Sequence, residues 1–266
     1  MQIKKGDIVG RKSYGKDILF KVNNIVKKTD EDVAILNGIT KRIEADSKIS
    51  DLEIISKKIV KEKIRKFDEN LEKRIHTKTD KRYTNEIKTG RILHLDGDKK
   101  YSEKSYHYYQ KMGLNAVVKN IPEYKQPKVV KHLLEIYKPD ILVITGHDGM
   151  LRRGIKYHDV YNYRNSRYFI ETVKQAREFD KKEGGNLVIF AGACQSYFEA
   201  LISAGANFAS SPARILIDFL DPLIVAEKVA TTERYKYITI DDIAYELRDG
   251  KDGVSGIGAK GKLSKM

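Results

Sequence analysis

Long apolar runs alternate with amphipathic segments from residue 91 onward. The runs ILVI (141–144) and LVIF (187–190) are apolar at every position, which is typical of strands covered on both faces. Residues 126–137 and 167–180 instead carry apolar side chains every three or four positions, which indicates helices packed on one side. Strands that alternate with such helices predict βαβ units and an α/β domain with a mostly parallel sheet over residues 91–250.

Residues 1–55 follow a different pattern, with short apolar runs of period two. Glycines interrupt the first run, and Asn37-Gly38 is a turn signal inside the second. Four or five short strands in so few residues predict a small SH3-like β-barrel domain. At the other end of the chain, residues 251–266 are rich in glycine and lysine, and we expect a flexible tail there.

Residues 56–90 are expected to form a basic helical linker between the two domains. Apolar residues recur here at helical spacing, and 13 basic residues against 6 acidic ones lie between Lys57 and Arg91. This stretch carries half of the net charge of +14. A solvated connector helix accounts for it. Because excess Lys and Arg also suits an acidic partner, a nucleic-acid-binding protein that uses the linker and the barrel is the alternative function, although nucleic acid is the less favoured partner.

The composition excludes several classes of protein. The chain has no run of 18 apolar residues and no apolar centre near its start, so we expect no membrane span, no signal peptide and an intracellular protein. A single cysteine, Cys194, allows neither an internal disulfide nor a thiolate zinc site. No group of histidines and carboxylates has the spacing of metal ligands. We therefore expect neither a metal nor a cofactor.

A lone cysteine is either a buried apolar residue or a reactive thiol, and the position of Cys194 favours the second. Cys194 closely follows the run 187–190, as His147 follows the run 141–144. In open α/β sheets, chemistry gathers at the carboxyl ends of strands, where a thiol needs a histidine as its acid/base partner. All six histidines precede Cys194, which disfavours papain-like peptidases and class I glutamine amidotransferases. The separation of 47 residues is close to the roughly 50 of caspases.

Small residues beside this pair predict an oxyanion hole. Glycines flank both His147 and Cys194 in the sequences TGHDG and AGACQS, and they let a peptide approach the backbone closely. The N–H groups of Cys194 and of Asp148 or Gly149 are the candidate donors to the oxyanion. The Asp148 carboxylate has three open roles: it orients His147, it binds substrate, or it caps a helix.

These residues carry a family resemblance. An apolar block followed by His-Gly, and a second block followed by Ala-Cys, resembles the clan of cysteine peptidases that includes caspases, clostripain, gingipains and separases. The departure is Asp148, which stands between His147 and Gly149. More closely, the chain resembles a family of sporulation-specific cysteine proteases. The matching stretches are GDIVGRKSYGKDILFKV, ITGHDG and FAGACQSYFEALISAGANFASSP.

The resemblance implies a caspase-like sheet and an endopeptidase that cuts spore coat and cortex-associated proteins after Arg or Lys. It also implies a sporulating bacterium, with the protein in the cytoplasm of the mother cell or at the spore coat. In the wider clan, an acidic residue after the first strand selects a basic P1 side chain. Here that loop offers Asp96 and Asp98, whose carboxylates suit a guanidinium, although Asp-Gly is also a common turn.

Two further expectations concern substrates. Ser210 and Ser211 stand in an extended piece after the cysteine, which is able to pair with a substrate backbone but is also readable as a plain turn. The basic segment 57–91 lies between the domains and offers many Lys and Arg residues. A protease that cuts after basic residues is therefore expected to process itself there.

Overall fold

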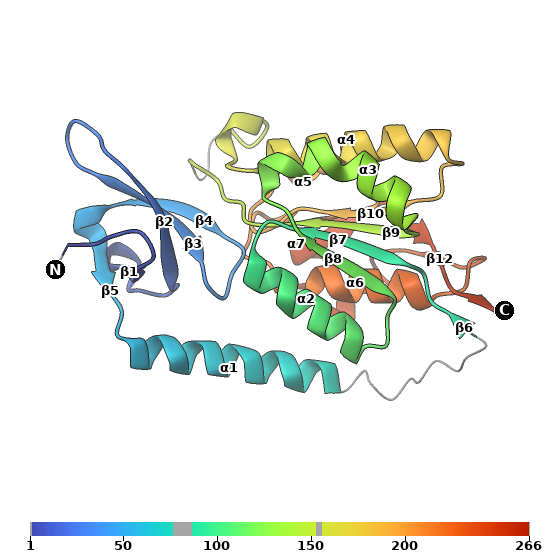
Figure 1. Ribbon diagram of the computed structural model, residues 1–266, viewed down its shortest axis with the longest axis horizontal. Helices are drawn as coiled ribbons and strands as arrows, with labels where there is room; N and C mark the ends of the chain where they lie inside the picture. The colour runs from blue at the N-terminus through green and yellow to red at the C-terminus, as the bar shows by residue number, and fades with distance from the viewer. Residues whose placement is uncertain (1, 77–86, 153–155, 266) are drawn as a thin grey trace.

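The computed structural model describes residues 2–76, 87–152 and 156–265. A small antiparallel sheet at the N-terminus and a larger sheet flanked by helices lie side by side, with a long helix running beneath both (Figure 1). Among the described residues, no helix is long and apolar enough to cross a membrane.

The N-terminal sheet has five antiparallel strands in the order β4-β3-β2-β1-β5. Their bounds are Ile8–Arg11 (β1), Phe20–Val26 (β2), Val33–Gly38 (β3), Glu44–Lys48 (β4) and Leu52–Ile54 (β5). Side chains of β3 alternate between buried and half-buried, as its period-two pattern requires. The number of strands agrees with the sequence, while the SH3-like barrel expected from them stays a prediction.

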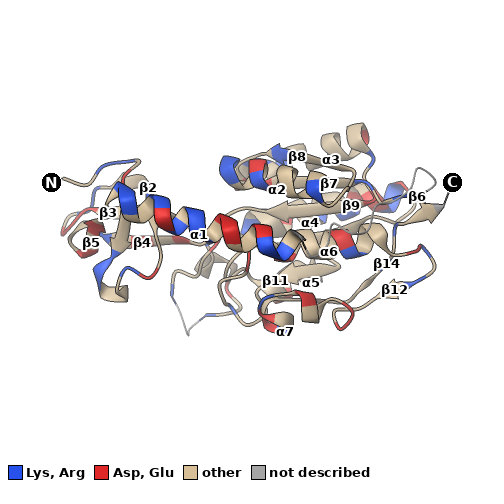
Figure 2. Cartoon of the chain, turned by 90° about the horizontal axis from the view of Figure 1, so that it is seen from below, with Lys and Arg blue, Asp and Glu red and all other residues tan. Residues whose placement is uncertain are grey.

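Helix α1 (Lys57–His76) occupies the segment in which a helix was expected. Leu71 and Ile75 are buried against the larger domain, with Phe67 packed beside them. Acidic and basic residues are intermixed along the helix (Figure 2), and several of them pair, as Arg65 does with Glu69 and Lys66 with Glu62. Residues 77–86 of the basic linker lie outside the described residues.

The larger sheet has six strands in the order β13-β11-β10-β9-β7-β8. Its strands are β7 (Ile92–Asp96), β8 (Ala116–Asn120), β9 (Ile141–Thr145), β10 (Val188–Ala191), β11 (Phe208–Ser210) and β13 (Val254–Gly256). All pairings are parallel except that of β11 with β13. The sequence prediction of an α/β domain with a mostly parallel sheet is therefore confirmed.

Helices cover both faces of this sheet. They are α2 (Lys99–Lys111), α3 (Gln126–Tyr137), α4 (Ser166–Lys182), α5 (Phe198–Ser203), α6 (Asp221–Thr231) and α7 (Gly250–Gly253). Side chains of β9 alternate between two cores: Ile141 and Val143 pack with α2 and α6, while Leu142 and Ile144 pack with α3 and α4. This two-sided burial explains why the strand is apolar at every position.

The C-terminal segment differs from the flexible tail expected for residues 251–266. It supplies β13 at the edge of the larger sheet and two short strands, β14 (Ala259–Lys260) and β15 (Ser264–Lys265), which pair with β12 (Tyr237–Ile238) and β6 (Ile87–Lys88). Val254 and Ala259 are buried. The glycines that suggested mobility allow close approach instead, since a Cβ at Gly256 would lie 2.1 Å from the Asn207 carbonyl oxygen.

Candidate active site

The register of β9 and β10 brings His147 and Cys194 to the same edge of the sheet. Ile144 of β9 pairs with Ala191 of β10, and His147 and Cys194 each come three residues later. Neighbouring parallel strands lie about 4.8 Å apart, so the two residues leave the sheet side by side. The expectation that the strands before His147 and Cys194 are adjacent and parallel is therefore confirmed, and a catalytic role for the pair stays a prediction.

Cys194 is fully buried and packs into the core of the N-terminal sheet, together with Phe20, Ile43 and Ile217. Its Sγ lies 4.0 Å from the Ile217 carbonyl oxygen. Burial raises the pKa of the thiol to about 12, because a thiolate loses its hydration there. In this state the thiol is neutral and covered by the N-terminal domain.

His147 is 1% exposed, and its ring is held from the N-terminal domain. Nε2 lies 3.2 Å from the Gly38 carbonyl oxygen, at the end of β3. A carbonyl oxygen only accepts, so Nε2 carries the hydrogen and Nδ1 is left without one in the neutral ring. Tyr101 packs edge-on against the imidazole with ring centroids 5.8 Å apart. The tautomer therefore presents Nδ1 as the nitrogen able to take up a proton.

The connection between β3 and β4 crosses this edge of the larger sheet. The Arg42 carbonyl oxygen accepts hydrogen bonds from the backbone N–H of Cys194 at 3.3 Å and from that of Asp148 at 3.2 Å. The next residues continue along the same path, since the Glu44 N–H donates to the Asp148 carbonyl oxygen at 2.8 Å. Two of the three candidate oxyanion donors therefore converge on one peptide carbonyl.

The Arg42 side chain is buried and only 2% exposed. Nη2 donates to Asp96 Oδ2 at 2.8 Å. The guanidinium carbon lies 4.9 Å from the ring centroid of Tyr101 and 5.0 Å from that of Phe219, within the range of cation–π attraction. One buried carboxylate and two aromatic faces thus enclose one guanidinium.

Asp96 and Asp98 have different surroundings. Asp96 is fully buried at the end of β7, and its Oδ2 also accepts from the Thr145 hydroxyl at 2.7 Å. Thr145 in turn contacts the buried His94 ring at 2.6 Å. The Asp98 carboxylate instead caps α2 by accepting from the N–H groups of Lys100 and Tyr101. Of the two acids singled out from the sequence, only Asp96 contacts the buried arginine.

The Asp148 carboxylate is buried and accepts four hydrogen bonds. It accepts from the Gly149 N–H at 2.9 Å, from Asn165 N at 2.8 Å and from the hydroxyls of Ser166 and Ser196. These bonds tie the loop after β9 to the start of α4 and to the loop after β10. Burial raises the pKa of Asp148, and these hydrogen bonds oppose the rise. Because the Gly149 N–H is engaged by this carboxylate, it does not reach the Arg42 carbonyl.

The two serines are buried at and just after the end of β11, beside Cys194 in the fold but apart from the Arg42 contacts. Ser211 Oγ donates to the Ile215 carbonyl oxygen at 2.9 Å and accepts from the Gln195 N–H at 3.1 Å. Among the described residues, Ser210 Oγ has no hydrogen-bond partner. The hydroxyls therefore hold the loop beside Cys194, and a role of either serine in binding substrate stays a prediction.

Sequence reasoning missed four residues of the site: Arg42, Tyr101, Glu123 and Phe219. Glu123 Oε1 accepts from the His147 N–H at 2.8 Å, and burial raises the pKa of this carboxyl to about 7. The one sequence signal for Arg42 was the pair Lys41-Arg42, which closely follows the turn signal at Asn37-Gly38. The chain was also expected to cut after basic residues. Nothing in the local pattern distinguishes the other three.

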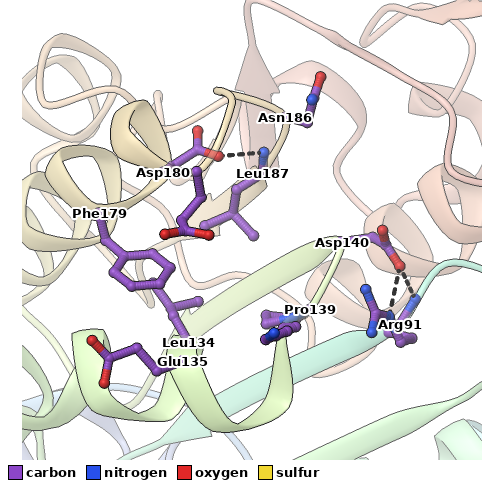
Figure 3. A pocket seen from close by; sticks show the side chains of 11 residues that line it. Arg91, Leu134, Glu135, Pro139, Asp140, Phe179, Asp180, Asn186 and Leu187 are labelled. Atoms are coloured by element: carbon purple, nitrogen blue, oxygen red, sulfur yellow. Dashed lines mark hydrogen bonds and ion pairs between the residues drawn. The ribbon is translucent and has the colours of Figure 1, made fainter.

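An open pocket of about 360 Å³ lies at the opposite end of the strands (Figure 3). Its residues include Asp140, just before β9, and Leu187, just before β10. Asp140 accepts from the Arg91 N–H at 2.8 Å, and Asp180 accepts from the Leu187 N–H at 2.9 Å. Asp140 and Asp180 therefore bind backbone N–H groups. Over the described residues, no group of three or more His, Cys, Asp or Glu side chains is arranged to hold a metal ion.

Comparisons with known proteins identify the family of the chain. The family model described as YabG peptidase U57 matches residues 4–266. The chain is 37% identical to the sporulation-specific protease YabG of Bacillus subtilis (strain 168), over 99% of this chain and 97% of that protein. No solved structure matches the chain.

Proposed function

Since the chain belongs to the YabG peptidase U57 family, whose relative in Bacillus subtilis is a sporulation-specific protease, we propose that it is a cysteine endopeptidase. Cys194 is the nucleophile, His147 is the acid/base and the peptide bond after an arginine is cut. The family makes the chain a sporulation protease; the cysteine mechanism and the basic specificity are our proposals. Lys is the expected second choice at P1, because its ammonium lacks the paired donors of a guanidinium.

One observation carries the proposal. The Arg42 carbonyl oxygen lies within 3.3 Å of the N–H groups of Cys194 and Asp148 while the Arg42 guanidinium binds the buried Asp96. A substrate arginine bound in the same way places its carbonyl oxygen on the N–H groups of Cys194 and Asp148, beside the Cys194 thiol. Such donors stabilise the oxyanion that forms on attack, and the loss of one typically lowers the rate by about 10²–10³.

The chemistry follows from these positions. Cys194 Sγ attacks the carbonyl carbon of the P1 arginine, and its proton passes to His147 Nδ1. Collapse of the tetrahedral intermediate breaks the C–N bond as His147 returns the proton to the leaving amine. Water then hydrolyses the thioester. The strand order, with one antiparallel edge strand, supports a caspase-like arrangement of the peptidase domain.

We also propose the biological setting that the resemblance implies. Spore coat and cortex-associated proteins are the expected substrates, in the mother cell of a sporulating bacterium or at its spore coat. The N-terminal domain is the expected docking module for protein substrates. The nucleic-acid-binding alternative gains nothing from the structure, because ion pairs within α1 offset part of its positive charge.

Replacement of the nucleophile tests the proposal. Cys194→Ala should abolish cleavage of a fluorogenic peptide with Arg at P1, while circular dichroism and thermal unfolding remain close to those of wild type. His147→Ala should act in the same way. Cys194→Ser is the matched control for volume, and it should retain the fold and lose the activity. Cleavage by Cys194→Ala at the wild-type rate would rule out the mechanism.

A further inference from the structure

The segment Gly38–Glu44 occupies the proposed active site in the manner of a substrate. It joins β3 to β4, and it contacts the catalytic groups at three places. The Gly38 carbonyl oxygen holds the His147 ring, the Arg42 carbonyl oxygen rests on the N–H groups of Cys194 and Asp148, and the Arg42 side chain fills the pocket of Asp96. A plain hairpin turn would need none of these contacts.

The backbone beyond Arg42 also runs as a substrate would. Ile43 forms a parallel bridge with Asp148, and the Glu44 N–H donates to the Asp148 carbonyl oxygen. Backbone pairing of this kind holds an extended peptide in register while side-chain pockets choose the sequence. The Ile43 side chain lies in the same apolar cluster as Cys194. The peptide bond between Arg42 and Ile43 is therefore the bond whose carbonyl oxygen rests on the Cys194 N–H.

We infer that the Arg42–Ile43 peptide bond is the first bond that this peptidase cuts, within its own chain, and that the cut opens the arginine pocket to other substrates. The inference rests on the proposed function and names a substrate of the same site. It replaces the basic linker as the principal site of self-processing. In the part of that linker that the structure describes, α1 packs against the core of the larger domain through Leu71 and Ile75, whereas residues 38–44 contact both Cys194 and His147.

Cys194 Sγ bonds to the carbonyl carbon of Arg42 and gives its proton to His147, and the oxyanion is held by the N–H groups of Cys194 and Asp148. The C–N bond to Ile43 then breaks, and His147 protonates the new amine of Ile43. Water hydrolyses the thioester, which leaves a carboxylate on Arg42 and a free thiol. No oxidant, metal or cofactor is needed.

Before the cut, Arg42 competes with any other arginine for one pocket. Its tether makes this competition severe, because a linked group acts at a high effective concentration. The uncut protein should therefore cleave added peptides slowly. After the cut, residues 39–42 are joined to the sheet at one end only, and Arg42 is free to leave. Cleavage of added peptide should thus show a lag that follows the appearance of the new N-terminus.

The experiment incubates freshly purified full-length protein and follows it by intact mass and N-terminal sequencing. A fluorogenic peptide with Arg at P1 is added in parallel samples. We expect a fragment that begins at Ile43, at a rate that does not change on tenfold dilution, because the reaction is intramolecular. Cys194→Ala should stay full length. Arg42→Ala should slow the cut after residue 42 by about 10²-fold or more, since the arginine provides the charged contact with Asp96.

Matched variants keep the result interpretable. Lys41→Ala removes the neighbouring basic side chain and should leave the cut before Ile43 in place. Arg42→Lys should cut at the same bond more slowly. Arg42→Ala should cleave the added peptide without a lag, which also reports that it is folded. Cleavage of the wild-type chain after Lys41 instead of after Arg42 would overturn the assignment of Arg42.

The two proposals fail in distinguishable ways. If wild type cleaves the peptide without a lag while its own chain stays intact at Arg42, self-cleavage is wrong and the peptidase stands. If it cuts itself elsewhere, in residues 57–91 for example, but not before Ile43, the inference is likewise overturned. If neither its own chain nor the peptide is cut, both the inference and the proposed function are wrong.

Discussion

At the amino end of the parallel strands an open pocket lies beside Asp140 and Asp180 (Figure 3), whereas at the carboxyl end Arg42 fills the space beside Cys194. Among the described residues that line the open pocket there is no cysteine or histidine, and Asp140 and Asp180 bind backbone N–H groups. The carboxyl end has a thiol, an imidazole, two converging N–H groups and a buried acid. In this chain the open pocket and the groups suited to peptide hydrolysis therefore lie at opposite ends of one sheet. An empty pocket is thus a poor guide to function.

The largest expected effect concerns the reactivity of Cys194. At pH 8 the full-length species should react with iodoacetamide about 10³-fold more slowly than the urea-unfolded chain. The thiolate population falls tenfold for each unit by which burial raises the pKa, from 9.0 to about 12. Intact mass separates the full-length species from any cut product. Equal rates in the folded and unfolded chains would contradict a covered, neutral thiol.

The same pKa has a consequence for stability. Because the folded chain binds the thiol proton more tightly than the unfolded chain does, this contribution to stability is present below pH 9. It is lost as the pH rises from 9 towards 12. Urea unfolding of Cys194→Ala should lack this loss.

Asp96→Asn should lower kcat/KM for a peptide with Arg at P1 by about 10²–10³. The variant leaves a buried guanidinium without its carboxylate, which typically costs about 3–5 kcal/mol. Asp98→Asn is the matched control at the end of the same loop. It should change the free energy of unfolding by about 1 kcal/mol or less, as expected for a helix cap, and leave the preference for Arg unchanged. A peptide with Leu at P1 should not distinguish Asp96→Asn from wild type.

Glu123→Gln should produce a smaller, pH-dependent effect. Burial raises the pKa of Glu123 from 4.5 to about 7, so the folded state binds this proton more tightly than the unfolded state. The stability it contributes is present below pH 4.5 and is lost as the pH rises through 7. Relative to Glu123→Gln, the wild-type side chain should lose on the order of 3 kcal/mol between pH 4.5 and 8. Urea unfolding in a Cys194→Ala background measures this, and parallel pH profiles would contradict it.

The smallest effect is expected at the amino end. Arg91→Ala removes an ion pair with Asp140 in which the Arg91 side chain is half exposed, and such pairs are worth about 0–1 kcal/mol. Peptide cleavage should stay within about twofold of wild type. A large loss of activity would mean that the open pocket takes part in catalysis, and the contrast between the two ends would fail.

The periodic pattern of the chain was enough to predict the parallel sheet and the adjacency of the two strands that precede His147 and Cys194. Apolar runs such as 141–144 report two-sided burial, and the position of a residue after such a run reports the strand end. That Arg42 fills the site could not be predicted from this pattern. Arg42 arrives from a separate domain, and its contact with Asp96 joins residues 54 positions apart. The pattern around Arg42 describes only a hairpin turn, because local periodicity reports burial rather than which distant surface is met.

The prediction of a flexible C-terminal tail failed for a related reason. Short strands such as β13 pair at a sheet edge that only the complete fold provides, and their glycines look like a mobile tail when the partner is unknown. Asp98 was considered beside Asp96 because both follow the same strand. The choice between them depends on which carboxylate faces inward, and two residues beyond Asp96 the Asp98 carboxylate caps the start of α2 instead.

The strand order of the N-terminal sheet determines what a cut after Arg42 leaves behind. Residues 1–42 contain β1, β2 and β3, while β4 and β5 at the two edges belong to the downstream chain. The shorter piece is therefore clasped on both sides by strands of the longer one. The mature enzyme should be a two-chain protein that migrates as two bands on a denaturing gel and elutes as one species under native conditions. Its Gly38 carbonyl remains on the shorter chain, so the acid/base of one polypeptide is oriented by another.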